Sequence, residues 1–272
     1  MFVDKLVKIY FSPTYSTEKI VQTIAKEIGM VEQKTINLNS LGQRHNIKFN
    51  IQPTEAVILG TPVYEERIPD LLYPVLRKIH GQGQLMILVV TYGNISAGIA
   101  LKQLNKMMTY QGFKVIAAAS FIGEHSFSQE DIKIAPGRPD NRDLEIAESL
   151  GKEIQQKIKS IKSIKNIPDL NIKGELLPLG KLLPKHSEIV FAHAPVVDLK
   201  VCQNCRKCIE ICPVNAIEPD RLRSRDKLCI RCFACVRFCP YGARKIIYKK
   251  PVFVKTVLKR LGRKRKEPEF FI

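Results

Sequence analysis

Several features that would place this chain in a membrane or on a nucleotide are missing from its sequence. None of its apolar runs approaches the roughly 18 residues that a membrane-spanning helix needs. The start, Met1–Phe11, has no basic segment followed by a long apolar stretch, so no secretory signal is evident. The motifs G-x-G-x-x-G, G-x4-G-K-[ST] and C-x3-C-x2-C are also absent. We therefore expect a soluble protein without a nicotinamide fingerprint, a P-loop or a radical S-adenosylmethionine site.

Acidic residues are in the minority, with 26 Asp and Glu against 44 Lys and Arg and a formal net charge of +18. Such a charge favours acidic proteins, anionic lipids or nucleic acids as binding partners and does not distinguish among the three. A groove for single-stranded nucleic acid would interleave exposed aromatic side chains with the cations. That pattern is missing from the basic end of the chain, whose cations are Lys255, Lys259, Arg260, Arg263, Lys264, Arg265 and Lys266. We rank nucleic-acid binding last and expect acidic partner proteins.

Cysteine is absent outside two runs that both read C-x2-C-x2-C-x3-C-P, and adding 27 to each cysteine number of the first run gives the second. Zinc sites usually pair C-x2-C with a second pair further along the chain, not with two more thiols so close. Four thiolates per site are what an iron–sulfur cubane requires. The spacing therefore favours two [4Fe–4S] clusters, and electron transfer, over structural zinc or a disulfide framework. No cysteine is left for disulfides, which fits a reducing cytoplasm.

The duplicated run resembles that of bacterial two-cluster ferredoxins, in which the fourth cysteine of each run ligates the other cluster. The resemblance implies that cluster one is held by Cys202, Cys205, Cys208 and Cys239. It implies that cluster two is held by Cys229, Cys232, Cys235 and Cys212.

The first 160 residues alternate between strand-like and helix-like patterns. Apolar, β-rich runs are found at Leu6–Phe11, Lys34–Leu38, Ala56–Gly60, Leu85–Thr91 and Val115–Ile122. Helical patterns follow at Thr17–Ile28, Ile68–Ile79, Ala97–Tyr110 and Asp143–Ile161. Strands that are apolar on both faces are typical of a parallel sheet covered by helices, so the pattern predicts a doubly wound, five-stranded α/β domain. The predicted division is an α/β domain at 1–161, a connector at 162–195, a small α+β cluster domain at 196–250 and a basic tail at 251–272.

The loop after the first strand, Ser12-Pro13-Thr14-Tyr15-Ser16-Thr17, resembles the phosphate loop of flavodoxins, which has the form T/S-x-T-G-x-T. The resemblance implies an FMN phosphate held by Ser12, Thr14, Ser16 and Thr17. It places the flavin ring at the ends of the third and fourth strands, near Pro62, Tyr64, Tyr92, Gly93, Asn94 and His125. The two tyrosines are candidates for ring stacking or ordinary half-buried aromatics. His125 is a candidate proton-exchanging group or an ordinary loop histidine.

One residue departs from the flavodoxin pattern, because Tyr15 stands where that pattern has glycine. Glycine adopts positive φ freely, whereas tyrosine does so only at an energetic cost.

Residues 5–250 as a whole resemble a family of anaerobe proteins in which a flavodoxin-like domain is fused to a two-cluster ferredoxin. The resemblance implies an electron carrier that relays single electrons between two [4Fe–4S] clusters and FMN, with redox proteins as partners. The alternative is an enzyme whose flavin reduces a small substrate and is fed by the clusters.

Overall fold

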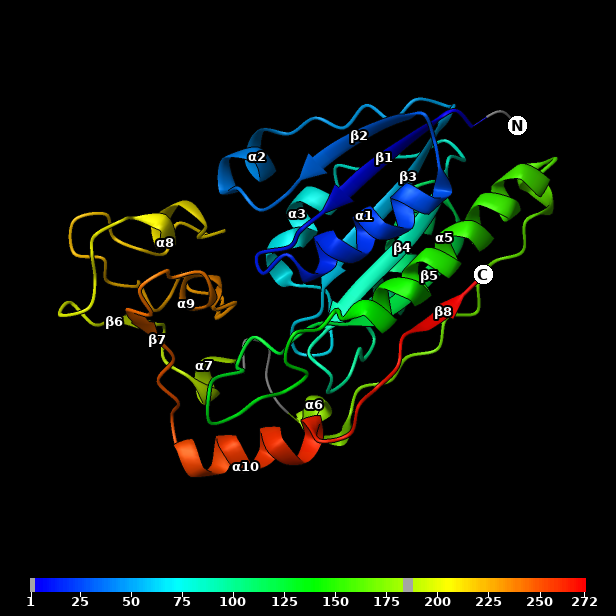
Figure 1. Ribbon diagram of the computed structural model, residues 1–272. Coiled ribbons are helices and arrows are strands. Elements are labelled where there is room, and N and C mark those ends of the chain that lie inside the picture. The colour runs from blue at the N-terminus through cyan, green and yellow to red at the C-terminus, as the bar shows by residue number, and fades with distance from the viewer. Residues whose placement is uncertain (1–2, 183–187) are drawn as a thin grey trace.

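The computed structural model describes residues 3–182 and 188–272, and its larger part is a sheet between layers of helices (Figure 1). All five predicted parallel strands are confirmed, with the bounds β1 Lys5–Tyr10, β2 Glu32–Asn37, β3 Glu55–Pro62, β4 Leu85–Tyr92 and β5 Lys114–Ile122. They are hydrogen-bonded in the order β2-β1-β3-β4-β5. This is the strand order of the flavodoxin-like doubly wound fold.

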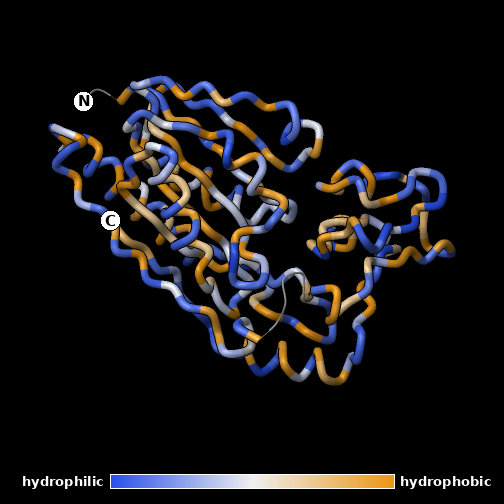
Figure 2. The backbone as a smooth tube through the Cα atoms, turned by 180° about the vertical axis from the view of Figure 1, so that it is seen from behind, coloured by the Kyte–Doolittle hydropathy of each residue, from blue (hydrophilic) through white to orange (hydrophobic). Residues whose placement is uncertain are grey.

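Helices cover both faces of the sheet and divide its core into two clusters. One face packs against α1 (Ser16–Ile28) and α5 (Asn141–Ser160), and the other against α3 (Tyr73–Leu76) and α4 (Ala100–Tyr110). The central strands are therefore apolar on both sides, which Figure 2 shows as continuous hydrophobic colour along them. This burial explains why the strands could be read as unbroken apolar runs.

The helix predicted at Ile68–Ile79 is divided into a 3₁₀ turn, Asp70–Leu72, and the short α3. Pro74 lies in the first turn of α3, where its missing N–H costs nothing, whereas a continuous helix would need that donor. Helix α2, Leu41–Asn46, was not predicted, and the Ser40 side chain caps its first turn.

The sequence predicted a basic tail at 251–272, but these residues form a helix and a strand and fold back onto the α/β domain. They form α10 (Pro251–Gly262) and β8 (Glu269–Phe271), and β8 pairs antiparallel with β5 as a sixth strand (Figure 1). The buried Asn94 amide donates to the carbonyls of Gly262, at 2.9 Å, and Lys264, at 3.0 Å. The end of the chain therefore runs from the cluster domain back to the edge of the sheet.

The connector and the cluster domain contain short elements only. In the connector these are a 3₁₀ turn at Ile164–Asn166, α6 (Pro178–Leu182) and α7 (Glu188–Phe191). The cluster domain has β6 (Val196–Val197) paired antiparallel with β7 (Arg244–Lys245), together with α8 (Lys207–Glu210) and α9 (Ala234–Arg237). The boundaries at 161, 195 and 250 stay a prediction.

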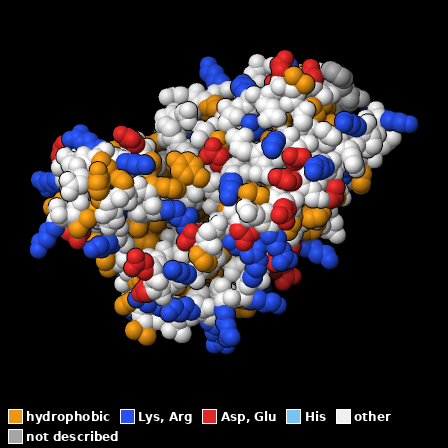
Figure 3. Space-filling model, in the orientation of Figure 1, with side chains coloured by type: hydrophobic (Ala, Val, Ile, Leu, Met, Phe, Trp, Pro, Cys, Tyr) orange, Lys and Arg blue, Asp and Glu red, His pale blue; other side chains and the backbone are white. Residues whose placement is uncertain are grey.

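No helix in the two described ranges is long and apolar enough to cross a membrane. Lys and Arg side chains are spread over both parts of the visible face and do not form one continuous groove (Figure 3).

Candidate functional site

The two cysteine runs fold into the same loop twice, with the 27-residue offset that the sequence shows. Positive φ occurs at equivalent positions of the two loops, in the pairs Asn204 and Arg231, Arg206 and Phe233, and Asn215 and Gly242. Five of these six residues are not glycine, so the backbone takes an unfavourable conformation to form each loop. Such strain is typical of a ligand-binding loop.

Backbone amides point at cysteine sulfur in both loops. Ala216 N–H donates to Cys212 Sγ and Ala243 N–H donates to Cys239 Sγ, each at 3.2 Å. A sulfur that accepts hydrogen bonds from amides carries negative charge at lower cost, as a cluster ligand must. The loops therefore have the donors that a cubane site needs.

One cavity of the cluster domain is lined by Cys202, Cys205, Cys208 and Cys239. Burial raises the pKa of the Cys229, Cys232 and Cys235 thiols, and the nearby Cys212 thiol adds to this rise. Metal binding removes such protons. Cys208 also acts on Cys235, so the two groups of cysteines lie close to each other.

A cubane is a group of eight atoms surrounded by four cysteines, and the two loops supply eight cysteines and an amide donor to one sulfur of each loop. The residues therefore fit two clusters, and the assignment of each thiol to a cluster stays a prediction.

The predicted phosphate loop lies between β1 and α1 and is held by its own hydrogen bonds. Asn39 Oδ1 accepts from Ser12 N–H at 2.6 Å, and Ser12 Oγ accepts from Glu18 N–H at 3.0 Å. The buried Thr17 hydroxyl bonds the Thr91 hydroxyl at 2.5 Å. Ser12 and Thr17 therefore build the loop, and their hydroxyls already have partners within the fold.

Thr14 and Ser16 differ from these two residues. Their hydroxyls, and the backbone N–H groups of Thr14, Ser16 and Thr17, have no hydrogen-bond partner in the described parts of the chain. Gly123 keeps the space beside them open, since a Cβ there would lie 3.0 Å from Ser16 Cβ. Free N–H groups at the start of a 13-residue helix suit an anion such as a phosphate.

Tyr15 takes the conformation that glycine has in the flavodoxin pattern, with φ of 63°. Its ring contacts Phe238 of the cluster domain, with centroids 4.9 Å apart and planes tilted by 58°. The contact offsets part of the backbone cost and joins the loop to the residue before Cys239. The departure from glycine is thus explained by a contact between the two domains.

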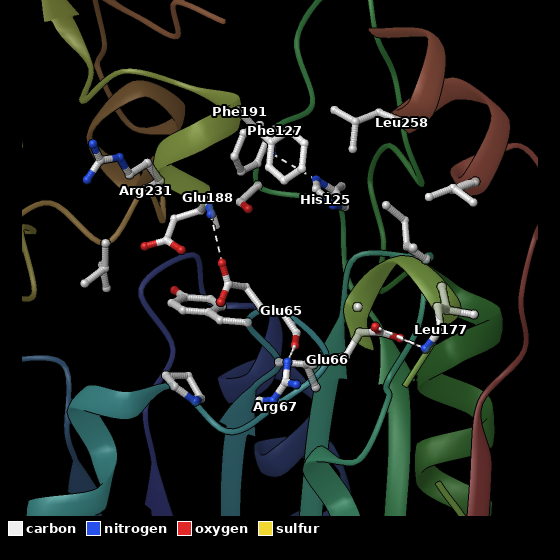
Figure 4. Close-up of a pocket in the computed structure, with 18 of the residues that line it drawn as sticks. Glu65, Glu66, Arg67, His125, Phe127, Leu177, Glu188, Phe191, Arg231 and Leu258 are labelled. Carbon is white, nitrogen blue, oxygen red and sulfur yellow. Dashed lines mark hydrogen bonds between the residues drawn. The ribbon is translucent and has the colours of Figure 1, made fainter. Parts of the chain in front are cut away.

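A cavity of about 310 Å³ lies where the ends of the strands meet the cluster domain (Figure 4). The α/β domain contributes the segment after β3, the residue Ile95 after β4, and His125–Phe127 after β5. The opposite wall comes from α7, from α10, and from Ile230 and Arg231, which lie between Cys229 and Cys232. The volume lies at the lower end of the usual range for ligand sites, about 300–1,000 Å³.

Of the predicted ring-binding residues, Tyr64 and His125 line this cavity, whereas Pro62, Tyr92, Gly93 and Asn94 do not. Tyr92 is buried, and burial together with the Glu269 carboxylate raises its pKa to about 12. The Asn94 side chain donates to carbonyls of the segment after α10. Tyr92 and Asn94 therefore do not form the wall of this cavity.

His125 is held as a neutral imidazole at the cavity wall. Its Nδ1 accepts from Phe127 N–H at 3.1 Å, and its ring packs on Gly93, where a Cβ would lie 2.5 Å from Cδ2. Burial, and then the nearby Arg237 cation, lower its pKa to about 4. His125 therefore presents a neutral Nε2–H group at neutral pH.

This lowered pKa predicts acid sensitivity. The unfolded chain protonates His125 near pH 6.5 and the folded chain only near pH 4, so stability is lost as the pH falls between these values. We expect His125→Asn, whose amide oxygen can replace Nδ1, to reduce that loss. The measurement is the urea midpoint at pH 7 and pH 5 for both proteins. An equal drop in the two proteins would show that His125 does not titrate in this way.

Comparison with known proteins agrees with the two-part architecture. Residues 194–240 match the family model of the 4Fe-4S dicluster domain. A comparison with curated proteins finds no match. The chain therefore joins a flavodoxin-like fold to a 4Fe–4S dicluster domain.

Solved structures that resemble the chain include a flavodoxin from the domain Archaea, at 18% identity over 57% of this chain and 99% of that one, with a TM-score of 0.42. Rubredoxin oxygen:oxidoreductase from the anaerobe Desulfovibrio gigas is 19% identical over 58% of this chain and 37% of that one, with a TM-score of 0.41. A flavone reductase is 13% identical over 60% of this chain and 65% of that one, with a TM-score of 0.42.

Proposed function

We propose that the protein relays single electrons between two [4Fe–4S] clusters and a bound FMN. The observation that carries this proposal is the composition of the 310 Å³ cavity. One wall is made by loops at the carboxyl ends of the strands, where open α/β sheets bind ligands. The other wall contains Ile230 and Arg231, which connect two predicted ligands of cluster two. A ring in this cavity would lie directly beside that cluster.

Two groups of residues would hold FMN, one at its phosphate and one at its ring. Thr14, Ser16 and the free N–H groups of the loop would bind the phosphate, and Tyr64 and His125 would contact the ring. Gly123 and His125 belong to one segment, which packs on Ser16 and also reaches the cavity, so the two parts of the site are adjacent. Bound FMN supplies one- or two-electron chemistry, and each cluster supplies one-electron chemistry.

Interdomain contacts hold the clusters against the α/β domain. The buried Arg44 donates to the Leu38 carbonyl at 2.6 Å and also to the carbonyl of Pro213, next to Cys212. Phe127 packs edge-on against Phe233, with centroids 5.0 Å apart. Cys205 is exposed and Cys232 is buried, so cluster one would face partners and cluster two would face the cavity. Exposed cations near cluster one suit acidic redox proteins as partners.

The test is a double substitution of the two free hydroxyls, Thr14→Val with Ser16→Ala. Hydrogen bonds to a charged group contribute about 1.5–3 kcal/mol each, so we expect FMN affinity to fall at least tenfold. Anaerobically purified and FMN-reconstituted proteins are compared by flavin titration, with iron and sulfide measured on the same samples.

The matched control is Thr109→Val with Ser149→Ala, which removes one threonine and one serine hydroxyl from exposed helix positions. Control protein should bind FMN like the wild type. If wild-type protein takes up no FMN from excess cofactor, the relay is excluded. If the loop variant binds FMN normally, the phosphate lies elsewhere.

A second candidate function is a reductase of a small substrate, and one feature of the cavity favours it. Glu188 and Glu65 meet there, with Glu188 N–H donating to Glu65 Oε1 at 2.8 Å (Figure 4). Burial and the Glu65 carboxyl raise the pKa of Glu188 well above its usual range. Such a pair can hold a proton for a substrate that gains electrons. Steady-state turnover with small acceptors, in the absence of a partner protein, would distinguish the reductase from the carrier.

A further inference from the structure

Arg244 is a buried cation at the site of cluster one. It begins β7, and only 3% of its surface is exposed. Its guanidinium donates to the Pro195 carbonyl at 3.2 Å and to Ser224 Oγ at 3.0 Å, and Nη2 lies 3.6 Å from Cys208 Sγ. The same side chain lines the cavity that the four cysteines of cluster one surround.

The charge of Arg244 has no anionic partner in the described part of the protein. Its acceptors are a carbonyl, a hydroxyl and a cysteine sulfur, and its buried Nε–H has no acceptor at all. Removing an unpaired guanidinium from water is costly, so buried charges are normally paired. A cubane with four thiolates is negatively charged in both of its oxidation states. Cluster one, when bound, would supply the counter-ion that this arginine lacks.

The other buried arginines near the cysteines are placed differently. Arg231 donates to Asp226 Oδ1 at 2.8 Å, so a carboxylate already compensates its charge. Arg44 donates to the carbonyl of Pro213 and interacts electrostatically with the Cys212 thiol of cluster two, but none of its hydrogen bonds in the described residues goes to sulfur. Arg244 alone among these three has both an uncompensated charge and a sulfur contact.

The internal repeat distinguishes the two cluster sites at this position, although the Arg244 charge also acts on Cys235 of cluster two, where it opposes the rise in the thiol pKa that burial causes. Arg244 follows Cys239 by five residues, and the equivalent position after Cys212 is occupied by Ile217. Ile217 is also buried, at 4% exposure, but it carries no charge. The two loops share the positive φ positions and the amide-to-sulfur hydrogen bonds, yet differ here. The chain has thus placed a charge beside cluster one and an apolar group at the matching place beside cluster two.

We propose that Arg244 raises the reduction potential of cluster one and makes it the preferred electron site of the pair. With both clusters bound, an electron passing from cluster two to cluster one would oxidise the former by one electron and make the latter more negative by one charge. The guanidinium stabilises that added charge, since net charge and hydrogen bonds to sulfur both set cluster potentials. Cluster one is also the more exposed site, so it would pass electrons to a partner protein. The proposal rests on the two-cluster part of the proposed function and not on FMN.

The test compares wild-type protein with Arg244→Ile, which copies the side chain at the equivalent repeat position, and with Arg244→Lys, which keeps the charge. Arg223→Gln is the control for losing an exposed arginine in the same domain. Full-length proteins are titrated anaerobically and followed by electron paramagnetic resonance. The signal of cluster one is identified by its loss in Cys208→Ala protein. Iron, sulfide and flavin are measured on every sample.

In Arg244→Ile we expect the ratio of reduced to oxidised cluster one at a fixed potential to fall about tenfold, a shift of about 59 mV for a one-electron couple. Cluster two should shift less, Arg244→Lys should stay near wild type, and Arg223→Gln should move neither cluster. A shift no larger than that of Arg223→Gln, or one confined to cluster two, would overturn the proposal.

If the Arg244→Ile protein does not retain cluster one, the Arg244→Lys protein provides the test. A lysine protein that keeps cluster one near its wild-type potential supports a role for the charge. If the Arg244→Lys protein also loses cluster one, Arg244 is needed only for the shape of the site, and the proposal fails. If wild-type protein takes up no FMN from excess cofactor and Arg244→Ile still shows the shift, the FMN relay is excluded and this inference stands.

Discussion

Protein purified without oxygen is expected to contain about eight irons and eight sulfides per chain, as two cubanes require. The structure supports this expectation by folding both cysteine runs into the same loop, with an amide 3.2 Å from the fourth sulfur of each run. The match of residues 194–240 to the 4Fe-4S dicluster domain agrees with it. Iron and sulfide assays, with the visible spectrum, provide the measurement. About four irons per chain in fully reconstituted protein would contradict it.

Two neighbouring cysteines should affect different clusters. Cys208 lies on α8 and lines the cavity of cluster one, whereas Cys212, four residues on, lies near Cys229, Cys232 and Cys235. We expect Cys208→Ala to remove or convert cluster one and Cys212→Ala to damage cluster two. Each variant should therefore lose about half of the iron, with different paramagnetic signals remaining. If both substitutions removed the same signal, the crossed assignment would be wrong.

Much of the fold could be predicted because its signals are local and periodic. Strand β4 is buried at every position, and its first six residues, Leu85–Val90, form an unbroken apolar run. Strand β8 gave no such signal, because Glu269–Phe271 is three residues long, lies at the edge of the sheet and follows a run of cations. Its pairing with β5 depends on a long-range contact that short-range periodicity cannot indicate.

The candidate site was predictable in its residue types and less so in the directions of its side chains. Asn94 follows β4 where a flavin-binding loop is expected, but its side chain bonds the returning C-terminal segment. Thr17 matches the phosphate-loop pattern, yet its hydroxyl bonds Thr91. Both contacts join residues that are far apart in the sequence, so local patterns do not predict them.

The sequence places Arg231 and Arg244 among the many cations that surround the cysteines, but it does not show that these two are buried. Both stand at positions where the two runs of the 27-residue repeat differ in charge, with Asn204 against Arg231 and Ile217 against Arg244. Other pairs, such as Glu210 against Arg237, differ in charge as well, so the repeat alone does not distinguish the buried arginines.

The largest effect on stability is expected from Arg138→Met. Arg138 donates to both carboxylate oxygens of Asp143, with Nε at 2.8 Å from Oδ2, and Asp143 is completely buried. Asp143 in turn accepts from Asp140 N–H at 2.9 Å and caps α5. Removing the guanidinium leaves a buried carboxylate unpaired, which costs about 3–5 kcal/mol. The measurement is the urea midpoint by circular dichroism, with the denaturant slope checked for a change.

Arg142→Met on the same helix is the matched control. Arg142 is exposed, and its ion pair with Glu267 is 3.5 Å long, so we expect a change of less than about 1 kcal/mol. Arg138 also donates to the carbonyl of Lys266 at 2.7 Å, just after α10. Its loss should therefore loosen the segment that holds α10 over the cavity, and amide exchange in 251–271 should rise even at low urea. Equal midpoints for the two variants would show that Asp143 finds another partner and that the buried pair does not hold this end of the chain.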